Sequence, residues 1–241
     1  MSPATIHPAA FVDPKARLGD GVVVEPGALI GPDVRIGART RIGSHALLTG
    51  WTTVGEDCRI HHGAVLGSPP QDLKYPGGTS YLEVGATTRV GSDCLLMAYS
   101  HVAHNCHIGS HVIVANVVQF AGYVTVEDWA IVGGGTVVHQ FARIGCHSMI
   151  GGGTRISQDV APYIKLAGSP PRLAGIYSIG LERRGFSVES RAALDRAYRV
   201  LFRGGKSTQE AVAELRDSWG AIAEVAHLAR FAETSERGLT R

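Results

Sequence analysis

The chain lacks the features of several large protein classes. It has no apolar run approaching the roughly 18 residues that would predict a membrane-spanning helix. Its 23 basic and 21 acidic residues leave a formal net charge of +2, which argues against a nucleic-acid binder held by a massed basic surface. The N-terminal stretch MSPATIHPAA has neither the basic nor the apolar region of a secretory signal. We therefore expect a cytoplasmic protein without a membrane span.

The spacing of the cysteines is typical neither of a metal site nor of a disulfide framework. The chain has four cysteines, none of them in a CxxC pair: Cys58, Cys94, Cys106 and Cys146. We expect reduced thiols rather than a disulfide framework.

What the chain does have is a six-residue repeat. An aliphatic or aromatic residue occupies every sixth position from Ile6 to Leu66 and, in the same register, from Val84 to Ile156, 24 positions in all. The fifth position of each hexad is small, and glycine takes the second position in about half of them. A period of six fits neither an ordinary helix nor a hairpin and indicates a parallel β-helix. We expect the first residue to fill a prism interior, the small fifth residue to lie near a corner, and the glycines to relieve strain at turns.

Two segments depart from the repeat. Residues 67–81, GSPPQDLKYPGGTSY, are rich in proline and glycine and predict a loop, which is either functional or a tolerated insertion. After Pro162, APYIKLAGSPPRL predicts a linker, followed by three amphipathic helices, with Ser207 and Glu210 resembling a capping box. Seven basic residues and two acidic ones lie between Arg183 and Lys206. They form either a solvated helix face or a dock for an acidic partner.

The stretch HVAHNCHIG, residues 101–109, places three histidines within seven positions. His101 and His107 take the sixth hexad position and His104 the third, so all three face outward or lie at corners. Outward positions around a prism diverge, whereas a metal site needs convergent ligands. We therefore expect no metal here, and we expect Cys106, at the fifth position, to be structural.

Vertical neighbours in such a prism are 18 residues apart. His104 then stacks beneath Gly122 and Gln140, His101 beneath Gln119, and Asn105 beneath Tyr123. With His139 these residues form a polar, histidine-rich strip beside a backbone amide that carries no side chain. The strip is either an ordinary solvated face or a functional site, and polarity alone does not separate the two.

Several stretches together resemble one family. QDLKY, HVAHNCHIG, NVVQFAGYVTVED, IVGGGTVVHQFARIG, QDVAPY, GLERRGFS and the ending RGLTR occur in the order seen in acyl-[acyl carrier protein]–UDP-N-acetylglucosamine O-acyltransferases, which catalyse the first step of lipid A synthesis. The resemblance covers nearly the whole chain. It implies a mainly β fold, a left-handed parallel β-helix over residues 1–165, with a C-terminal α-helical domain over residues 172–241.

The resemblance also implies roles for residues. His104 matches the general base that takes the proton from the glucosamine 3-hydroxyl, and an imidazole suits proton transfer near neutral pH. Asn105 matches the position that orients this base, which is often Asp. The backbone N–H of Gly122 matches the oxyanion donor. Further positions match substrate contacts or specificity: Asp72, Lys74, His101, His139, Gln140, the acyl-length position Gly152, and the basic pair Arg183 and Arg184. Tyr123 is a further candidate for contact with the substrate.

The implied partners are an acyl carrier protein, a UDP-sugar and two further copies in a homotrimer, with no cofactor. The chain departs from the family at Tyr123, commonly His, and at Tyr177 and Ile179, which replace Asn and Glu. About one coil after QDLKY and one hexad near the N-terminus are missing. Open alternatives are an N-acyltransferase acting on an amino nucleotide sugar, an acetyl-CoA-dependent enzyme, and a non-catalytic hexad protein.

Overall fold

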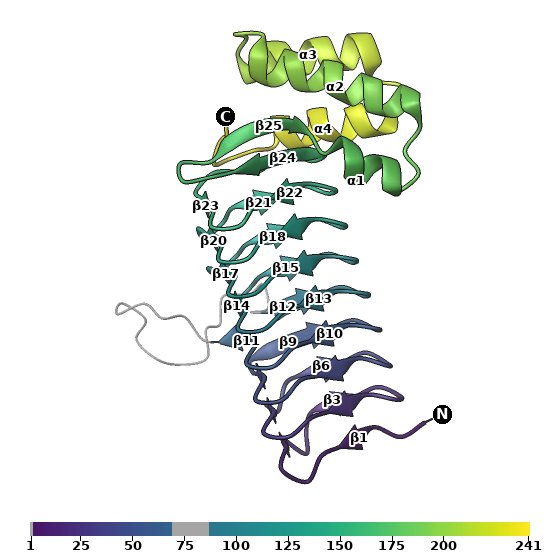
Figure 1. The fold of residues 1–241 in the computed structure, drawn as a ribbon, viewed down its shortest axis with the longest axis vertical. Coiled ribbons are helices and arrows are strands. Elements are labelled where there is room, and N and C mark those ends of the chain that lie inside the picture. The colour runs from purple at the N-terminus through teal and green to yellow at the C-terminus, as the bar shows by residue number, and fades with distance from the viewer. Residues whose placement is uncertain (1, 69–86) are drawn as a thin grey trace.

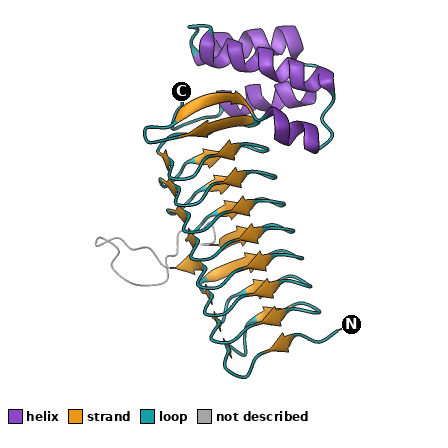
Figure 2. Cartoon of the chain, in the orientation of Figure 1, coloured by secondary structure: helices purple, strands orange, loops and turns teal. Residues whose placement is uncertain are grey.

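The computed structural model describes residues 2–68 and 87–241 and consists of short strands stacked into a three-sided prism, with helices at its C-terminal end (Figure 1). Each strand up to β24 pairs in parallel with the strand one coil above or below it, and the last strand, β25, pairs antiparallel with β24. The three sheets are the faces of the prism, here called faces A, B and C. This is the expected parallel β-helix with a helical C-terminal part (Figure 2).

From β1 to β23 the strands follow one another on faces A, B and C in turn, and the last two strands, β24 and β25, both belong to face A. Face A consists of β1 (Thr5–Ile6), β4 (Val23–Val24), β7 (Arg41–Ile42), β10 (Arg59–Ile60), β13 (Leu95–Leu96), β16 (Ile113–Val114), β19 (Ile131–Val132), β22 (Met149–Ile150), β24 (Ile164–Ala167) and β25 (Arg172–Ile176). Face B consists of β2 (Phe11–Val12), β5 (Leu29–Ile30), β8 (Leu47–Leu48), β11 (Val65–Ser68), β14 (His101–Ala103), β17 (Gln119–Phe120), β20 (Val137–Val138) and β23 (Arg155–Ile156). Face C consists of β3 (Arg17–Leu18), β6 (Arg35–Ile36), β9 (Trp51–Val54), β12 (Thr87–Val90), β15 (His107–Ile108), β18 (Thr125–Val126) and β21 (Arg143–Ile144).

The hexad positions take the expected places. Each short strand consists of a sixth and a first position, and from Val24 onward the first-position side chains are buried in the interior. Phe120 and Ile150, for example, have no exposed surface. Burying a side chain of this size contributes about 1.5–3 kcal/mol, so the repeat itself builds the core. The interior is filled, and a ligand must bind on the outside.

The reason for the second-position glycines differs from the expectation. The left-handed backbone conformation falls on the fourth position of the hexads, for example at Asn105 (φ 58°) and Tyr123 (φ 62°). The glycines instead lie where successive coils approach closely. A β-carbon on Gly37 would lie 2.5 Å from the carbonyl carbon of Gly55, and one on Gly91 would lie 2.7 Å from the carbonyl carbon of Gly109. Close backbone packing, rather than turn strain, requires glycine there.

The interruption after Leu66 keeps the register. Arg59 pairs with Leu95 and Val65 with His101, 36 residues apart in each case, which is two coils of sequence. Gly67 and Ser68, expected in the loop, belong to strand β11. The rest of the expected loop, residues 69–81 with Asp72 and Lys74, lies outside the described residues.

The expected linker after Pro162 is wrong. Strand β24 continues face A by pairing with β22, and β25 returns antiparallel to β24 as a hairpin. The prolines fall in the turn between the two strands, at Pro170 and Pro171, where no ladder hydrogen bond is required. The hairpin therefore caps the prism and connects it directly to the helices.

Four helices follow: α1 (Ser178–Arg183), α2 (Val188–Arg203), α3 (Thr208–Trp219) and α4 (Ala223–Glu233). Ser207 and Glu210 form the expected capping box at the start of α3. Arg143 of face C fastens α4, because its guanidinium donates to the Thr234 carbonyl at 2.9 Å and lies over the Phe231 ring. Among the described residues, no helix is long and apolar enough to cross a membrane.

Candidate active site

The turn between β14 and β15 holds His104 and Asn105, both half-buried, at the corner where faces B and C meet. Asn105 adopts a left-handed conformation, which asparagine tolerates better than most residues. Its side-chain oxygen lies 2.7 Å from Nδ1 of His104. An amide oxygen only accepts hydrogen bonds, so Nδ1 carries the proton and Nε2 of the neutral ring holds the free lone pair. His104 is thereby set up to accept a proton through Nε2.

Gly122 lies one coil above His104, and the absence of a side chain at this position leaves room for the His104 ring. A β-carbon at this position would lie 2.5 Å from Cε1 and 2.6 Å from Nε2 of His104. Any larger residue would therefore displace the imidazole. Tyr123 N donates to the His104 carbonyl at 3.1 Å, which holds the two coils in register. The Gly122 N–H has no acceptor among the described residues. The glycine is itself buried, so the ring and the amide share one tightly packed corner.

His101 lies on face B beside this corner and pairs with Gln119, as the 18-residue spacing predicts. Its Nε2 lies 2.7 Å from the hydroxyl of Ser68, a buried residue at the end of β11. Burial lowers the pKa of His101, and the neighbouring His104 lowers it further. The Gln119 side chain turns away toward backbone carbonyls, including that of Val118 at 3.1 Å. The expected polar strip is therefore shorter than the spacing suggested.

Aromatic rings cover the same corner above His104. The Tyr123 ring meets the His104 ring edge-on at a centroid distance of 5.4 Å and stacks on Phe141 at 4.9 Å. Both aromatic residues are exposed over about half of their surface. His139 and Gln140 follow in the next turn and are exposed, and Nδ1 of His139 lies 3.1 Å from the Gln140 carbonyl. His104, Gly122, Tyr123 and Gln140 thus lie along one corner, as the sequence predicted.

Gly152, Arg183 and Arg184 lie elsewhere on the chain. Gly152 is at the corner between faces A and B, where a β-carbon would approach the Gly134 carbonyl oxygen to 3.0 Å. Arg184 lies at the corner between faces C and A, over the ring of Trp129 and 3.1 Å from Nδ1 of His147. Arg183 is exposed at the end of α1. A single chain therefore does not bring these residues to His104.

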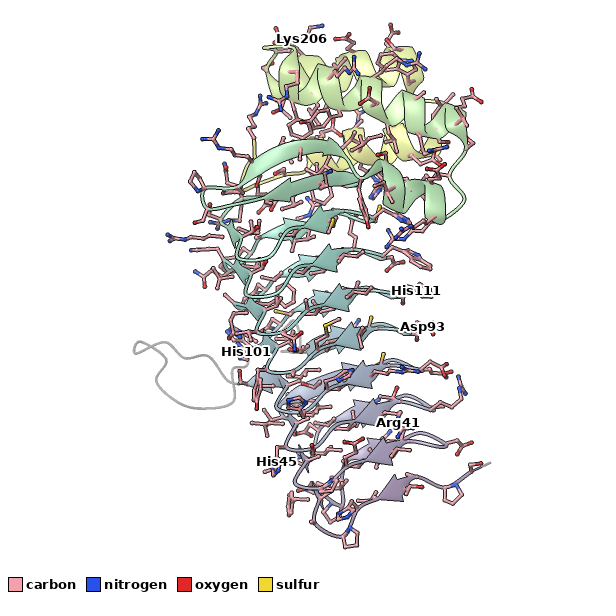
Figure 3. The ribbon with its side chains drawn as sticks, viewed as in Figure 1. Arg41, His45, Asp93, His101, His111 and Lys206 are labelled. Atoms are coloured by element: carbon pink, nitrogen blue, oxygen red, sulfur yellow. The ribbon has the colours of Figure 1, made fainter. Side chains whose placement is uncertain are left out.

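The corner between faces C and A carries an aromatic stack that the sequence did not reveal. Trp129 stacks on His111 at 4.0 Å and on His147 at 6.0 Å. Figure 3 shows His111 on the side of the prism opposite His101. Burial and the charge of Arg184 lower the pKa of His147 to about 4. The 18-residue spacing of His111, Trp129 and His147 is consistent with one vertical column, but no motif in the sequence marks this column as special.

One group among the described residues has the spacing of metal ligands: Glu127, Cys146 and His227. The atoms of Glu127 and His227 that could bind a metal already form hydrogen bonds within the protein. Arg230 donates to Nδ1 of His227 at 2.9 Å, so Nε2 carries the proton that His227 donates to Glu127 at 2.8 Å. Burial opposes ionisation of Glu127, yet the bonds from His227 and the Cys146 amide hold its pKa below the ordinary value. The hydrogen bond between His227 and Glu127 thus connects α4 to the prism. The absence of a metal remains a prediction.

The cysteines are placed as expected. Cys58, Cys94 and Cys106 are buried and Cys146 is half-buried, and all four are free thiols. Burial raises the pKa of Cys106 and of Cys146 to about 12, and Cys106 donates to the Ala121 carbonyl at 3.1 Å. The Cys106 and Cys146 thiols therefore stay protonated near neutral pH and are poor nucleophiles.

Comparison with known proteins points to one enzyme family. A family model described as UDP N-acetylglucosamine O-acyltransferase, domain 2, matches residues 159–240, and bacterial transferase hexapeptide repeats match residues 15–50, 33–68 and 87–118. The acyl-[acyl-carrier-protein]–UDP-N-acetylglucosamine O-acyltransferase of Burkholderia lata is 43% identical over 98% of this chain and 99% of its own length. That of Thiobacillus denitrificans is also 43% identical, over 99% of this chain and 100% of its own.

Solved structures agree with this grouping. LpxA from Acinetobacter baumannii superposes with a TM-score of 0.86 at 35% identity, over 98% of this chain and 99% of its own. LpxA of Bacteroides fragilis, a UDP-N-acetylglucosamine acyltransferase, gives a TM-score of 0.85 at 34% identity, over 98% of this chain and 100% of its own.

Proposed function

The chain belongs to the acyl-[acyl carrier protein]–UDP-N-acetylglucosamine O-acyltransferase family, and we propose that it moves a fatty acyl group, 3-hydroxylated, from acyl carrier protein to the 3-hydroxyl of UDP-N-acetylglucosamine. This is the first step of lipid A synthesis in the family. The observation that carries the proposal is the packing of His104 against Gly122, with Nε2 holding the free lone pair.

His104 acts as the general base. Nε2 takes the proton of the sugar 3-hydroxyl as that oxygen attacks the thioester carbonyl carbon. A positioned base of this kind contributes typically 10²- to 10⁴-fold to the rate. Asn105 holds the ring through Nδ1 but, as a neutral amide, adds no charge to stabilise the imidazolium that forms.

The Gly122 amide stabilises the charge that develops on the thioester oxygen. A backbone N–H that meets no acceptor within residues 2–68 and 87–241 suits this role, because it donates to the oxyanion without first breaking another bond. The tetrahedral intermediate then expels the pantetheine thiolate of the carrier, which takes the proton from His104. The ester forms, the carrier leaves as a free thiol, and the base is regenerated without any cofactor.

The remaining residues bind the substrates in this proposal. His101, His139, Gln140 and Tyr123 face the acceptor sugar or the acyl chain from the His104 corner. Asp72 and Lys74, outside the described residues, are proposed contacts to the sugar nucleotide. Lys74, Arg183 and Arg184 supply positive charge for phosphates or for the carrier, and Gly152 limits the acyl length.

A homotrimer completes the site. Gly152 and Arg184 lie at corners other than that of His104, so one chain cannot supply all of these residues to one substrate. Three prisms around a closed axis would bring the His104 corner of one copy to face A of the next, which lies between the other two corners. Sedimentation should give a trimer, and an active monomer would contradict this arrangement. Mixing inactive His104→Ala and Arg184→Ala proteins should restore part of the activity if sites are shared.

The compartment in which the reaction takes place and the division of the chain into domains are also proposals. We place the reaction in the cytoplasm, a reducing compartment that suits four free cysteines. We divide the chain into the β-helix of residues 1–165 and the helical domain of residues 172–241, although the β24–β25 hairpin spans the boundary.

A single assay tests the proposed reaction. Purified protein is offered acyl-carrier-protein thioesters of several lengths, with and without the 3-hydroxyl, together with UDP-N-acetylglucosamine or an amino nucleotide sugar. An ester product that hydroxylamine cleaves supports the proposal, and an amide product that resists it supports the N-acyltransferase instead. No product with any acceptor supports the non-catalytic alternative. Turnover with acetyl-CoA alone would indicate an acetyltransferase.

A further inference from the structure

Tyr99 is an exposed side chain that has no role in the site described so far. It lies in the turn between β13 and β14, at the corner between faces A and B, and is 60% exposed. Within residues 2–68 and 87–241, its carbonyl accepts from Gln119, its ring meets His62, and its hydroxyl has no partner. A tyrosine with a free, exposed hydroxyl offers a ligand both an apolar ring and a polar tip.

Contacts below and above hold the Tyr99 ring in place. A β-carbon on Gly63, one coil below, would lie 2.6 Å from Cδ1 and Cε1 of the ring, so the ring packs directly on the Gly63 backbone. His62 meets the ring edge-on at a centroid distance of 5.2 Å. From the coil above, the Gln119 side chain donates to the Tyr99 carbonyl at 3.3 Å. Because the ring is already ordered, little conformational entropy is lost when it contacts a ligand.

Tyr99 and His104 belong to the same coil, which runs through β13, β14 and β15. They are less than one strand spacing, roughly 4.8 Å, apart along the prism. Within one copy they lie at opposite edges of face B, where the Tyr99 ring meets His62 and the His104 ring meets Tyr123. Rotation about an axis parallel to the prism leaves the height of every coil unchanged. In the proposed trimer, Tyr99 of one copy therefore lies at the height of His104 of its neighbour.

The other side chains that face A presents at this height are apolar or have partners. Leu95 points outward from the middle of the face. At the edge away from Tyr99, the Asp93 carboxylate lies 3.6 Å from Nδ1 of His111, and the His111 ring is stacked at 4.0 Å on Trp129. The Tyr99 hydroxyl, by contrast, is free within the described part of the chain.

The corner above Tyr99 carries no hydrogen-bonding side chain at the equivalent positions. These are Val117, Gly135 and Gly153 in the next three coils. A β-carbon on Gly153 would meet nothing within 4 Å, so the corner is open there. From Tyr99 upward, this column of positions can therefore form side-chain hydrogen bonds only at the height of His104.

We propose that Tyr99 of each copy binds the acceptor sugar at His104 of a neighbouring copy, with its phenol hydroxyl bonded to a hydroxyl or acetamido group of the sugar; this rests on the proposed function. The sugar 3-hydroxyl has to reach Nε2 of His104, so the sugar lies at the height of this coil. An acyl chain has no group that requires the phenol hydroxyl, whereas a sugar ring has several. A fixed phenol on the opposite wall orients the ring so that its 3-hydroxyl meets the base.

The test uses two Tyr99 variants and one matched control. Tyr99→Phe removes only the hydroxyl and keeps the ring on Gly63, whereas Tyr99→Ala removes the ring as well. His45→Ala is the control, because His45 is exposed at the same corner and packs on Gly27 in the same way, two coils lower (Figure 3 labels His45). KM is measured separately for UDP-N-acetylglucosamine and for acyl-carrier protein, and binding of UDP-N-acetylglucosamine is measured calorimetrically. Sedimentation and thermal unfolding check that each variant assembles and folds.

Tyr99→Phe should raise both KM and Kd for UDP-N-acetylglucosamine roughly three- to tenfold, the range expected for the loss of one hydrogen bond. Its KM for acyl-carrier protein should not change. Tyr99→Ala should have at least the same effect on the sugar nucleotide, and His45→Ala should behave like wild type. Unchanged sugar-nucleotide binding in both Tyr99 variants, or an equal loss in His45→Ala, would overturn the inference.

Mixed trimers show whether Tyr99 acts across copies. His104→Ala and Tyr99→Ala chains are co-expressed with different tags, and trimers that carry both tags are purified. Every intact His104 in them belongs to a Tyr99→Ala chain, so contact across copies predicts some sites with the wild-type KM for the sugar nucleotide. A raised KM at all sites would overturn the inference. Wild-type protein that forms no ester would contradict the proposed function instead, and the calorimetric comparison, which needs no turnover, would still decide the role of Tyr99.

Discussion

The side-chain oxygen of Asn105 lies 2.7 Å from Nδ1 of His104, so a neutral amide orients the proposed base. Asn105→Asp should keep this geometry, because Asp also tolerates the left-handed conformation. A carboxylate beside the ring stabilises the imidazolium that forms when the base takes up the proton. We expect kcat to rise severalfold. Asn105→Ala should instead lower kcat by roughly 10- to 100-fold. An unchanged kcat in both Asn105→Asp and Asn105→Ala would count against His104 as the base.

Gly122 should tolerate no side chain. Gly122→Ala places a β-carbon 2.5 Å from Cε1 of His104 and should push the ring away from the acceptor hydroxyl. We expect kcat to fall by about two powers of ten, since small misplacements of a reacting group carry costs of this order. Gly31→Ala is the control, because its β-carbon would find its nearest atom at 3.5 Å. Equal activity of the two variants would show that the contact with His104 is unimportant.

Ser68 should position His101. Removing its hydroxyl in Ser68→Ala leaves Nε2 of His101 without its 2.7 Å partner. We expect KM for the sugar nucleotide to rise more than kcat falls, with Ser68→Thr restoring both. A purely structural role would instead lower the melting temperature without a selective effect on KM.

His147 should make stability depend on pH. Its pKa is lowered from 6.5 to about 4 in the folded protein, so below 6.5 the unfolded chain binds more protons than the folded one. Stability should therefore be fully present above pH 6.5, fall as the pH drops toward 4, and level off below that. His147→Phe keeps an aromatic ring in the stack and removes the titration, so its melting temperature should vary less across this window. The exposed His107→Phe should retain the wild-type slope.

The hexad register predicted most of the fold because, from Val24 onward, each described first-position side chain is buried in the same way. It correctly paired His101 with Gln119 and placed His104 beneath Gly122. The register could not predict the direction of the side chains. The Gln119 side chain donates to backbone carbonyls instead of joining the polar strip beside His104. The β24–β25 hairpin was missed because the hexads end at Pro162, although Ile164 to Ala167 alternate buried and exposed as a strand does.

The candidate site was predictable in part. Residues joined by one corner turn or by the 18-residue stack were found from spacing alone. The Ser68–His101 bond was not, because it depends on where the chain leaves and re-enters the prism. The stack of Arg184 on Trp129 was also missed, since it joins a helix end to a coil 55 residues earlier by number, with no repeat to relate them.

The most direct test of the central claim is turnover at saturating substrates of His104→Ala, His101→Ala and His107→Ala, each purified and shown to assemble like wild type. The His104 variant should lose roughly 10²- to 10⁴-fold in kcat and keep its melting temperature, since this half-buried side chain contributes little to the core. His101→Ala should raise KM more than it lowers kcat, and His107→Ala should keep kcat within about twofold. Near-normal turnover of His104→Ala with an inactive His101→Ala would contradict the account, because the base would then be His101.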